Sequence, residues 1–219
     1  MNSKLIPILI AAVALIGGIM FSFNINKSES IEKTPVNISG LLWPNPKQIS
    51  VFSLIDQNAE LFNLDNLQGK WSMMFFGYTH CPDVCPTTMT LLNSVVTELS
   101  ADEKINEETI PHVIFVTVDP ERDTQQHLSE YIAYFNNDFS GLTGSEEELS
   151  VLMKQLGILH MKVEDKNSTE NENYLMDHSS AILLLDPKAR LVGIFSTPHD
   201  KEDIKQRYLE ITEFISQRN

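Results

Sequence analysis

Two cysteines, four positions apart, lie where an apolar run gives way to a helical pattern. Cys81 and Cys85 are the only cysteines of the 219 residues, and they occur in the run Phe-Gly-Tyr-Thr-His-Cys-Pro-Asp-Val-Cys-Pro. Residues 71–76 are apolar apart from Ser72 and predict a buried strand, and residues 87–99 repeat apolar side chains at a helical period. Two thiols at a strand-to-helix turn can form a disulfide or bind a soft metal ion. The pair favours an α/β fold of the thioredoxin-like class.

The rest of the chain supports this fold class. Strands are expected at 113–118, 181–185 and 191–195, with hairpins joining 49–55 to 60–64 and 181–185 to 191–195, and helices at 124–135, 146–156 and 200–215. Ser145 and Glu148 predict a capping box for the second of these helices, and Gly157 its end. The acidic stretch at 164–173 predicts an exposed loop or hairpin tip. Together the elements predict a three-layer α/β/α sandwich over residues 46–219.

The N-terminus predicts a membrane anchor. Residues 5–23 form an apolar run without charge that would span about 28 Å as a helix, close to the thickness of a bilayer core. Lys4 precedes the run, so residues 1–4 are expected in the cytoplasm and the polar segment 24–45 as a tether. A cleaved signal peptide is the alternative, but its apolar core is usually only about 7–15 residues. We therefore expect a single-pass protein of a bacterial inner membrane, with its C-terminal domain in the periplasm.

The charge of the chain argues against one class of partner. The formal net charge is −14, and the sequence pI is about 4.7. Nucleic-acid binding requires a basic surface that neutralises phosphates. A nucleic-acid partner is therefore not expected, and the acidity is more simply explained by solubility.

Local sequence around the cysteines favours metal or redox chemistry over a purely structural disulfide. Pro86 suits the first helical turn, and Cys85 would then lie where the helix dipole stabilises a thiolate. Three residues separate the cysteines, whereas thioredoxin-type oxidoreductases have two. A structural zinc site would need two further ligands. A three-ligand copper site needs only one more donor, ideally an imidazole if Cu(II) is also to bind.

Six histidines could supply that donor, and His178 is the strongest candidate. It lies in the segment Asp-His-Ser-Ser that directly precedes the strand at 181–185. In a thioredoxin-like sheet this segment lies beside the dithiol turn. The alternative is a loop histidine held by a hydrogen bond. His80 adjoins Cys81, but neighbouring residues in an extended loop tend to point apart. The remaining histidines have weaker claims: His112, His127, His160 and His199.

Three segments together resemble the Sco/SenC family of copper proteins. They are the eleven-residue cysteine segment, the later Val-Asp-Pro-Glu-Arg-Asp-Thr at 118–124, and Asp-His-Ser at 177–179. The resemblance covers roughly residues 45–215 and the N-terminal anchor. It implies a thioredoxin-like fold that binds one copper ion, as Cu(I) or Cu(II), through Cys81, Cys85 and His178. It also implies that Asp177 orients the loop or the imidazole from outside the ligand set.

The resemblance further implies a function. Members of the family assist assembly of the dinuclear copper centre of cytochrome c oxidase, so the expected partner is the copper-receiving subunit of a haem-copper oxidase. The expected protein is a metallochaperone rather than an enzyme. The alternative is a thiol–disulfide reductase that keeps the recipient's cysteines reduced through Cys81 and Cys85. A peroxiredoxin-like peroxidase is disfavoured because Tyr78 and Pro82 stand where that chemistry usually has threonine. Copper or redox sensing stays an open alternative.

Overall fold

The structure is a computed structural model that describes residues 38, 41–164 and 174–217. Contacts group the described residues into one compact unit within Val36–Asn219. The expected anchor at 5–23 lies outside the described residues, as do residues 165–173 of the expected acidic loop. Within the described ranges, no helix is both long enough and apolar enough to cross a membrane.

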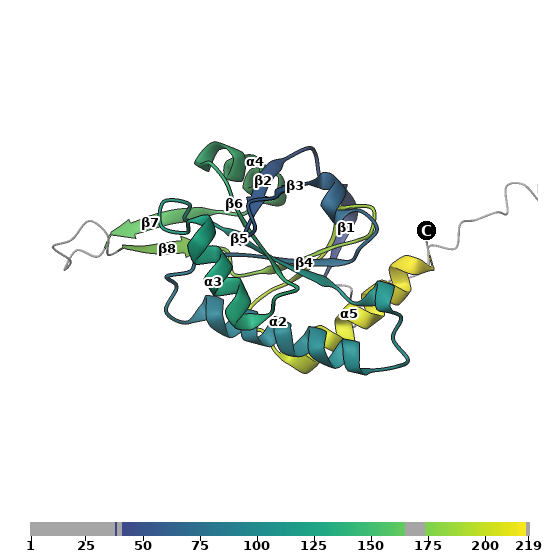
Figure 1. Cartoon of the computed structure of the whole chain (residues 1–219). Coiled ribbons are helices and arrows are strands. Elements are labelled where there is room, and N and C mark those ends of the chain that lie inside the picture. Colours follow the sequence, from purple (N-terminus) through teal and green to yellow (C-terminus); the bar gives the residue numbers. More distant parts are fainter. Residues whose placement is uncertain (1–37, 39–40, 165–173, 218–219) are drawn as a thin grey trace, which may run out of the picture. The chain divides into compact units, whose positions relative to one another are not determined.

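The unit Val36–Asn219 is built on an eight-stranded mixed sheet (Figure 1). Its strand order is β1-β10-β9-β4-β5-β6-β2-β3. The central strand β4 runs parallel to β5 and antiparallel to β9. The strands of this sheet are β1 (Leu42–Gln48), β2 (Ser53–Asp56), β3 (Leu61–Asn63), β4 (Ser72–Gly77), β5 (His112–Thr117), β6 (Ser140–Thr143), β9 (Ile182–Leu185) and β10 (Arg190–Phe195).

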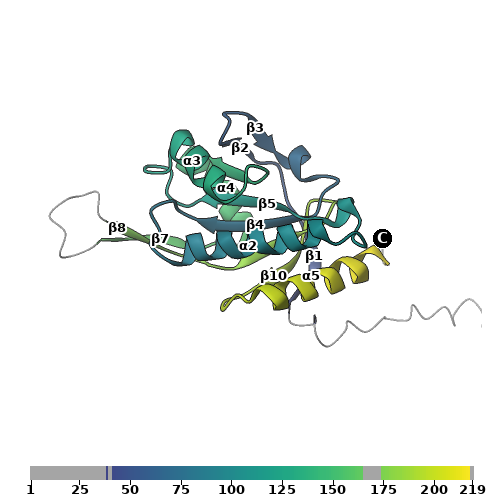
Figure 2. The same cartoon turned by 60° about the horizontal axis from the view of Figure 1, so that its bottom comes forward.

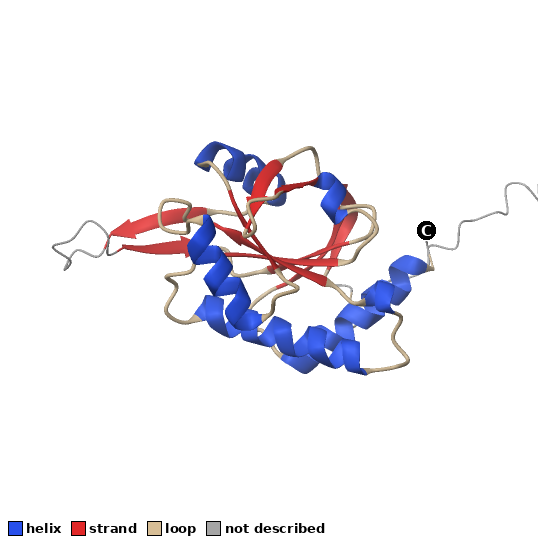
Figure 3. Cartoon of the chain, in the orientation of Figure 1, coloured by secondary structure: helices blue, strands red, loops and turns tan. Residues whose placement is uncertain are grey.

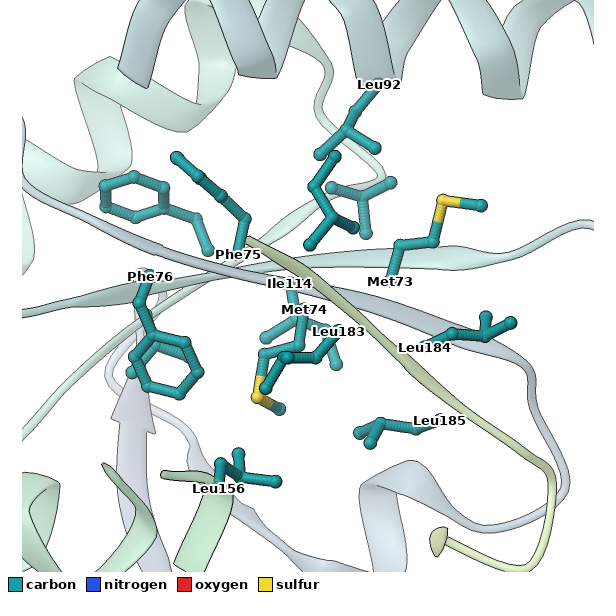
Figure 4. Packing of buried hydrophobic residues seen from close by; sticks show 14 of the residues in the cluster. Met73, Met74, Phe75, Phe76, Leu92, Ile114, Leu156, Leu183, Leu184 and Leu185 are labelled. Atoms are coloured by element: carbon teal, nitrogen blue, oxygen red, sulfur yellow. The ribbon is translucent and has the colours of Figure 1, made fainter. Parts of the chain in front are cut away.

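Helices cover both faces of this sheet. They are α2 (Val84–Ala101), α3 (Gln125–Phe135), α4 (Glu146–Leu156) and α5 (Lys201–Ser216), with short 3₁₀ turns η1 (Leu64–Leu67) and η2 (Glu107–Thr109). Helix α2 packs against both α3 and α5 (Figures 1 and 2). Figure 4 shows Leu92 of α2 on one side of the central strands and Leu156 of α4 on the other. The β4-α2-β5 unit, the β9–β10 hairpin and the closing helix α5 give the arrangement of a thioredoxin-like fold.

Strand β4 runs through the centre of the core. All six of its residues are buried, as expected for a strand covered on both faces. Met73 and Phe75 point towards α2, whereas Met74 and Phe76 point to the opposite side (Figure 4). Each such side chain contributes about 1.5–3 kcal/mol of burial free energy. This packing holds the carboxyl end of β4, where the cysteines begin, on a rigid base.

Two strands form a separate hairpin that projects from the main sheet. They are β7 (His160–Glu164) and β8 (Tyr174–His178), and they pair antiparallel (Figure 3). Neither strand was predicted from the sequence, which indicated an exposed loop or hairpin tip only for residues 164–173. His178 is the last residue of a strand rather than part of a loop.

Most predicted elements are confirmed, with shifted ends. Ser145 and Glu148 form the expected capping box, and Gly157 ends α4 in the left-handed conformation, with φ 71°. Helix α2 begins at Val84, which puts Cys85 in the first turn as expected. Ile38 is fully buried and β1 starts at Leu42, so part of the segment expected as a tether belongs to the fold. Strand β6 was not predicted, since it is short and carries Gly141.

Candidate metal centre

The two cysteines lie in the turn between β4 and α2. Cys85 is completely buried and Cys81 is 8% exposed, and both are free thiols. The backbone N–H of Cys85 donates to Cys81 Sγ at 3.4 Å, and that of Cys81 donates to the Tyr78 carbonyl at 3.2 Å. The first helical turn therefore brings the thiols together and leaves Cys81 as the more accessible one.

His178 approaches this dithiol from the end of β8. Its Nε2 lies 3.7 Å from Cys85 Sγ, and its Nδ1 lies 3.0 Å from the carbonyl oxygen of Ser179. Because a carbonyl can only accept, Nδ1 carries the proton and Nε2 turns a lone pair towards the thiol. The Tyr78 ring packs edge-on against the imidazole, with centroids 5.8 Å apart. Two segments distant in sequence thus present two thiols and one oriented imidazole.

The local electrostatics distinguish the two thiols. A side-chain hydrogen bond with Cys85 holds the pKa of Cys81 far below its usual value, against the opposing effect of burial. The hydrogen bond with Cys81, together with burial, raises the pKa of Cys85. These opposite shifts favour Cys81 as the thiolate and nucleophile and Cys85 as the thiol that keeps its proton.

Asp123 anchors the loop that leads into the cysteines. Its buried carboxylate accepts hydrogen bonds from the Thr79 backbone N–H at 3.0 Å, the Thr79 hydroxyl at 2.6 Å and the Thr117 hydroxyl at 2.6 Å. Burial raises the pKa of this carboxyl, and these three donors oppose the shift. Asp123 belongs to the 118–124 segment, but no role was predicted for it. The available signal was the predicted strand-helix-strand order, because such a unit pairs its strands in parallel and puts their carboxyl ends at one edge, as β4 and β5 do.

Arg122 fastens the hairpin that carries His178. Its Nε donates to Asp119 Oδ2 at 2.5 Å, and its Nη1 donates to the Tyr174 carbonyl at 3.0 Å. The guanidinium also lies 3.6 Å from the centroid of the Tyr174 ring, a cation–π contact. The Tyr174 hydroxyl donates to Asp119 Oδ1 at 2.6 Å, which closes the network. The loop after β5 thus holds the base of β8.

Asp177 lies on the other face of the hairpin from His178. Asp177 pairs across the strands with Met161 and is exposed, whereas His178 pairs with His160. Successive strand residues point to opposite faces, so the two side chains diverge. The Ser179 carbonyl makes the contact to His178 Nδ1 that was expected of Asp177. An orienting role for Asp177 stays a prediction that this geometry does not favour.

The donor set fits a soft metal ion only after a small rearrangement. Among the described residues, no three His, Cys, Asp or Glu side chains converge closely enough to hold an ion. The Cys85–His178 pair already has suitable spacing. Metal–sulfur and metal–nitrogen bonds of about 2.3 and 2.0 Å put the two donors about 3.6 Å apart on a shared ion, and the observed distance is 3.7 Å. Rotation of the Cys81 side chain would supply the third donor.

The fold and the site define a class: thioredoxin-like domains whose dithiol is joined by an imidazole from a hairpin. The SCO1/SenC family model matches residues 44–213, and the chain belongs to that family. The SCO2-like protein of Rickettsia felis is 32% identical over 206 residues, which cover 94% of this chain and 97% of the relative.

Solved structures agree with this assignment. Arabidopsis thaliana ScoI with copper bound is 33% identical with a TM-score of 0.67, covering 75% of this chain and 98% of that one. Yeast Sco1 with copper bound is 29% identical, with a TM-score of 0.67. The match covers 77% of this chain and 90% of yeast Sco1. BsSco is described as a member of the Sco family of cytochrome c oxidase assembly proteins with a disulfide switch. It is 21% identical with a TM-score of 0.57, and the match covers 77% of this chain and 95% of BsSco. At that identity the likeness supports the fold alone.

Proposed function

We propose that this protein is a membrane-anchored copper chaperone. It binds one copper ion through Cys81, Cys85 and His178 and delivers it to the copper-receiving subunit of a haem-copper oxidase, assisting assembly of the dinuclear copper centre. The observation that carries the proposal is the oriented imidazole, whose Nε2 faces Cys85 Sγ at 3.7 Å. Membership of the SCO1/SenC family and the copper-bound structures of relatives support it.

The chemistry of the donors suits a copper cargo. Thiolates select Cu(I), and imidazole also suits Cu(II). Three protein donors leave a coordination position open, through which a ligand of the recipient can enter while the chaperone's ligands leave. Cys81 lies at the surface edge of the site and Cys85 in the core. The copper ion is therefore expected to leave towards the surface, so that its bond to Cys85 breaks first and its bond to Cys81 last.

A second function, thiol–disulfide reduction, is favoured by the unequal thiols. The Cys81 thiolate would attack a disulfide of the recipient and form a mixed disulfide, releasing one recipient thiolate. Cys85 would then lose its proton and attack Cys81, which releases the second recipient thiolate and leaves a Cys81–Cys85 disulfide. Two electrons pass to the recipient in this step. The same pair could thus prepare the recipient's cysteines and supply their copper.

Replacement of His178 separates the two functions. In His178→Ala we expect Cu(II) affinity to fall by more than the roughly 10–100-fold that loss of an outer-sphere partner costs. The nitrogen coupling in the electron paramagnetic resonance spectrum should disappear, while the dithiol still reduces a model disulfide. His160→Ala is the matched control, because His160 lies directly opposite on the neighbouring strand.

Two outcomes would contradict the chaperone proposal. Copper affinity unchanged in His178→Ala would exclude the three-ligand site. Failure of the fully reduced protein to bind copper stably would leave the reductase as the better function. Thiolate charge-transfer absorption, followed in the same titration, distinguishes loss of the imidazole from loss of the thiols.

A further inference from the structure

A second pair of imidazoles lies beside the cysteine loop, outside the proposed ligand set. The rings of His80 and His127 have centroids 6.1 Å apart and an interplanar angle of 71°. We propose that these two histidines form an accessory binding site for a divalent transition-metal ion, with Cu(II) preferred. The site is independent of the copper centre formed by Cys81, Cys85 and His178.

His127 is held in the tautomer that a metal requires. Its Nδ1 lies 2.8 Å from the backbone carbonyl of Arg122. Since the carbonyl only accepts, Nδ1 carries the proton and the exposed Nε2 carries the lone pair. A ring N–H donated to a backbone carbonyl is the usual way in which a metal-binding histidine is oriented. His127 also lies in the first turn of α3, where the Thr124 cap fixes the backbone.

The hydrogen bonds of Thr79 assign His80 the same tautomer, with the proton on Nδ1. The Thr79 hydroxyl has one proton, which it donates to Asp123 Oδ1 at 2.6 Å. The same hydroxyl oxygen lies 3.1 Å from His80 Nδ1, so it must accept there and Nδ1 must be the donor. His80 Nε2 is then the free lone pair. The His80 side chain is 47% exposed, and an ion can reach it from solvent.

The spacing of the rings suits one shared ion. An ion bound to both Nε2 atoms at about 2.0–2.1 Å lies about 3.2 Å from each ring centre, so it can join rings up to about 6.4 Å apart. The observed 6.1 Å falls within that limit and implies a wide angle at the ion. Narrowing that angle requires a rotation of the exposed His80 ring, which gives up the Nδ1 contact with Thr79 Oγ1 and leaves α3 in place.

Charge and ligand type indicate which ions this pair takes. The positive end of the α3 dipole disfavours a cation. The Asp123 carboxylate, 3.7 Å from His80 Nδ1, offsets that effect. Imidazole donors suit Zn²⁺, Ni²⁺ and Cu²⁺, and Cu²⁺ binds most tightly in the usual order. In the described part of the chain no third His, Cys, Asp or Glu joins the pair, so water completes the coordination and the ion stays exchangeable.

The test removes the proposed copper centre first. The full chain in detergent, carrying Cys81→Ser, Cys85→Ser and His178→Ala, is titrated with Cu(II) and followed by electron paramagnetic resonance. We expect one equivalent with coupling to two nitrogens. Adding His127→Gln or His80→Gln should weaken binding at least tenfold, and adding His160→Gln should leave it unchanged.

A second measurement uses the unmodified protein. Zn(II) added beyond one equivalent should perturb the nuclear magnetic resonance signals of the His80 and His127 rings together, and neither perturbation should survive in His127→Gln. Binding that is equally strong without His127, or that His160→Gln weakens as much, would overturn the proposal. Because the first titration lacks all three proposed copper ligands, failure there leaves the chaperone function untouched.

Discussion

Gly77 is the residue that lets the thiol chemistry lie so close to the sheet. It ends β4, and a Cβ at this position would lie 2.8 Å from Cys85 Sγ and 2.8 Å from Phe115 Cε2. Neither neighbour can retreat, since both are fully buried. Any larger residue would displace the thiol or the core beneath it. The glycine before the Tyr-Thr-His-Cys run is therefore a packing requirement of the site, a role that the sequence alone did not reveal.

His112 gives the protein an acid-sensitive point far from the copper centre. It begins β5, and its Nε2 lies 3.0 Å from Ser140 Oγ. Burial lowers the pKa of His112 from 6.5 to about 4. Between those two values the unfolded chain takes up a proton that the folded chain does not. The free energy of unfolding should therefore fall as the pH drops from 6.5 to 4 and show no further loss from this group below that.

The expected size of that loss is about 3 kcal/mol. Urea unfolding, monitored by the fluorescence of buried Trp71, measures it across pH 7.5 to 4. In His112→Gln the fall with pH should be shallower by this amount, since the remaining carboxylates titrate equally in both proteins. Parallel curves for the two proteins would show that His112 does not cause the acid sensitivity.

At the scale of elements, the β7–β8 hairpin is held in place by the loop that follows β5. The Arg122 side chain joins Asp119 in that loop to the Tyr174 carbonyl and ring at the start of β8. His178 lies at the other end of the same strand. The position of the imidazole thus depends on a guanidinium that does not contact it.

Loss of Arg122 should therefore weaken both the fold and copper binding. Arg122→Ala leaves the buried Asp119 carboxylate without its main partner, and we expect the free energy of unfolding to fall by about 3 kcal/mol. Copper affinity should fall although all three ligands remain. Arg122→Lys should restore little of the stability or the copper affinity. Its ammonium group lacks the planar set of donors with which the guanidinium contacts several partners at once. Urea unfolding and copper titration measure the two effects.

Arg207 on α5 offers a matched control for this experiment. It pairs with Asp203 one helical turn away, and both side chains are substantially exposed. Such surface pairs contribute about 0–1 kcal/mol. Arg207→Ala should leave copper binding unchanged and stability nearly so. Copper affinity retained in Arg122→Ala would show that the hairpin does not need this clamp to position His178.

At the scale of the whole molecule, the proposed function requires the folded unit to work beside a membrane. Residues 5–23 are the expected anchor. In a bacterial host the full chain should stay in the membrane during carbonate extraction. An added protease should digest the unit beyond residue 36 only after the outer membrane is opened. Leu15→Arg with Ile16→Arg should release it, because each charge costs about 2.5–3.5 kcal/mol at a helix centre.

The control for that experiment puts the same charges outside the apolar run. Ser28→Arg with Ser30→Arg should leave the protein membrane-bound. Release of the unmodified chain by carbonate, or a mature protein that begins beyond residue 23, would favour the cleaved signal peptide. Neither result would affect the fold or the metal centre.

The sequence by itself determined the local elements and the identity of the thiols. Apolar runs and periods predicted β4, β5, α2 and the β9–β10 hairpin, and the capping residues predicted both ends of α4, because these signals depend on neighbouring residues. Spacing made His178 the strongest candidate for a third donor, and the resemblance to the Sco/SenC family implied Cys81, Cys85 and His178 as a set. The sequence could not show where the polar hairpin strands begin, since their pairing depends on a partner strand.

Only the tertiary structure decided which side chains meet. The Cys85–His178 contact joins residues 93 positions apart, and the Thr79–Asp123 bonds join residues 44 apart. The pleat of β8 turned Asp177 away from the imidazole that it was expected to orient, because successive residues of a strand point to opposite faces. Neither His80 nor His127 stood out in the sequence. Their rings are neighbours because α3, which follows β5, begins beside the cysteine loop. Such encounters depend on parallel strand pairing and helix packing, which local sequence does not encode.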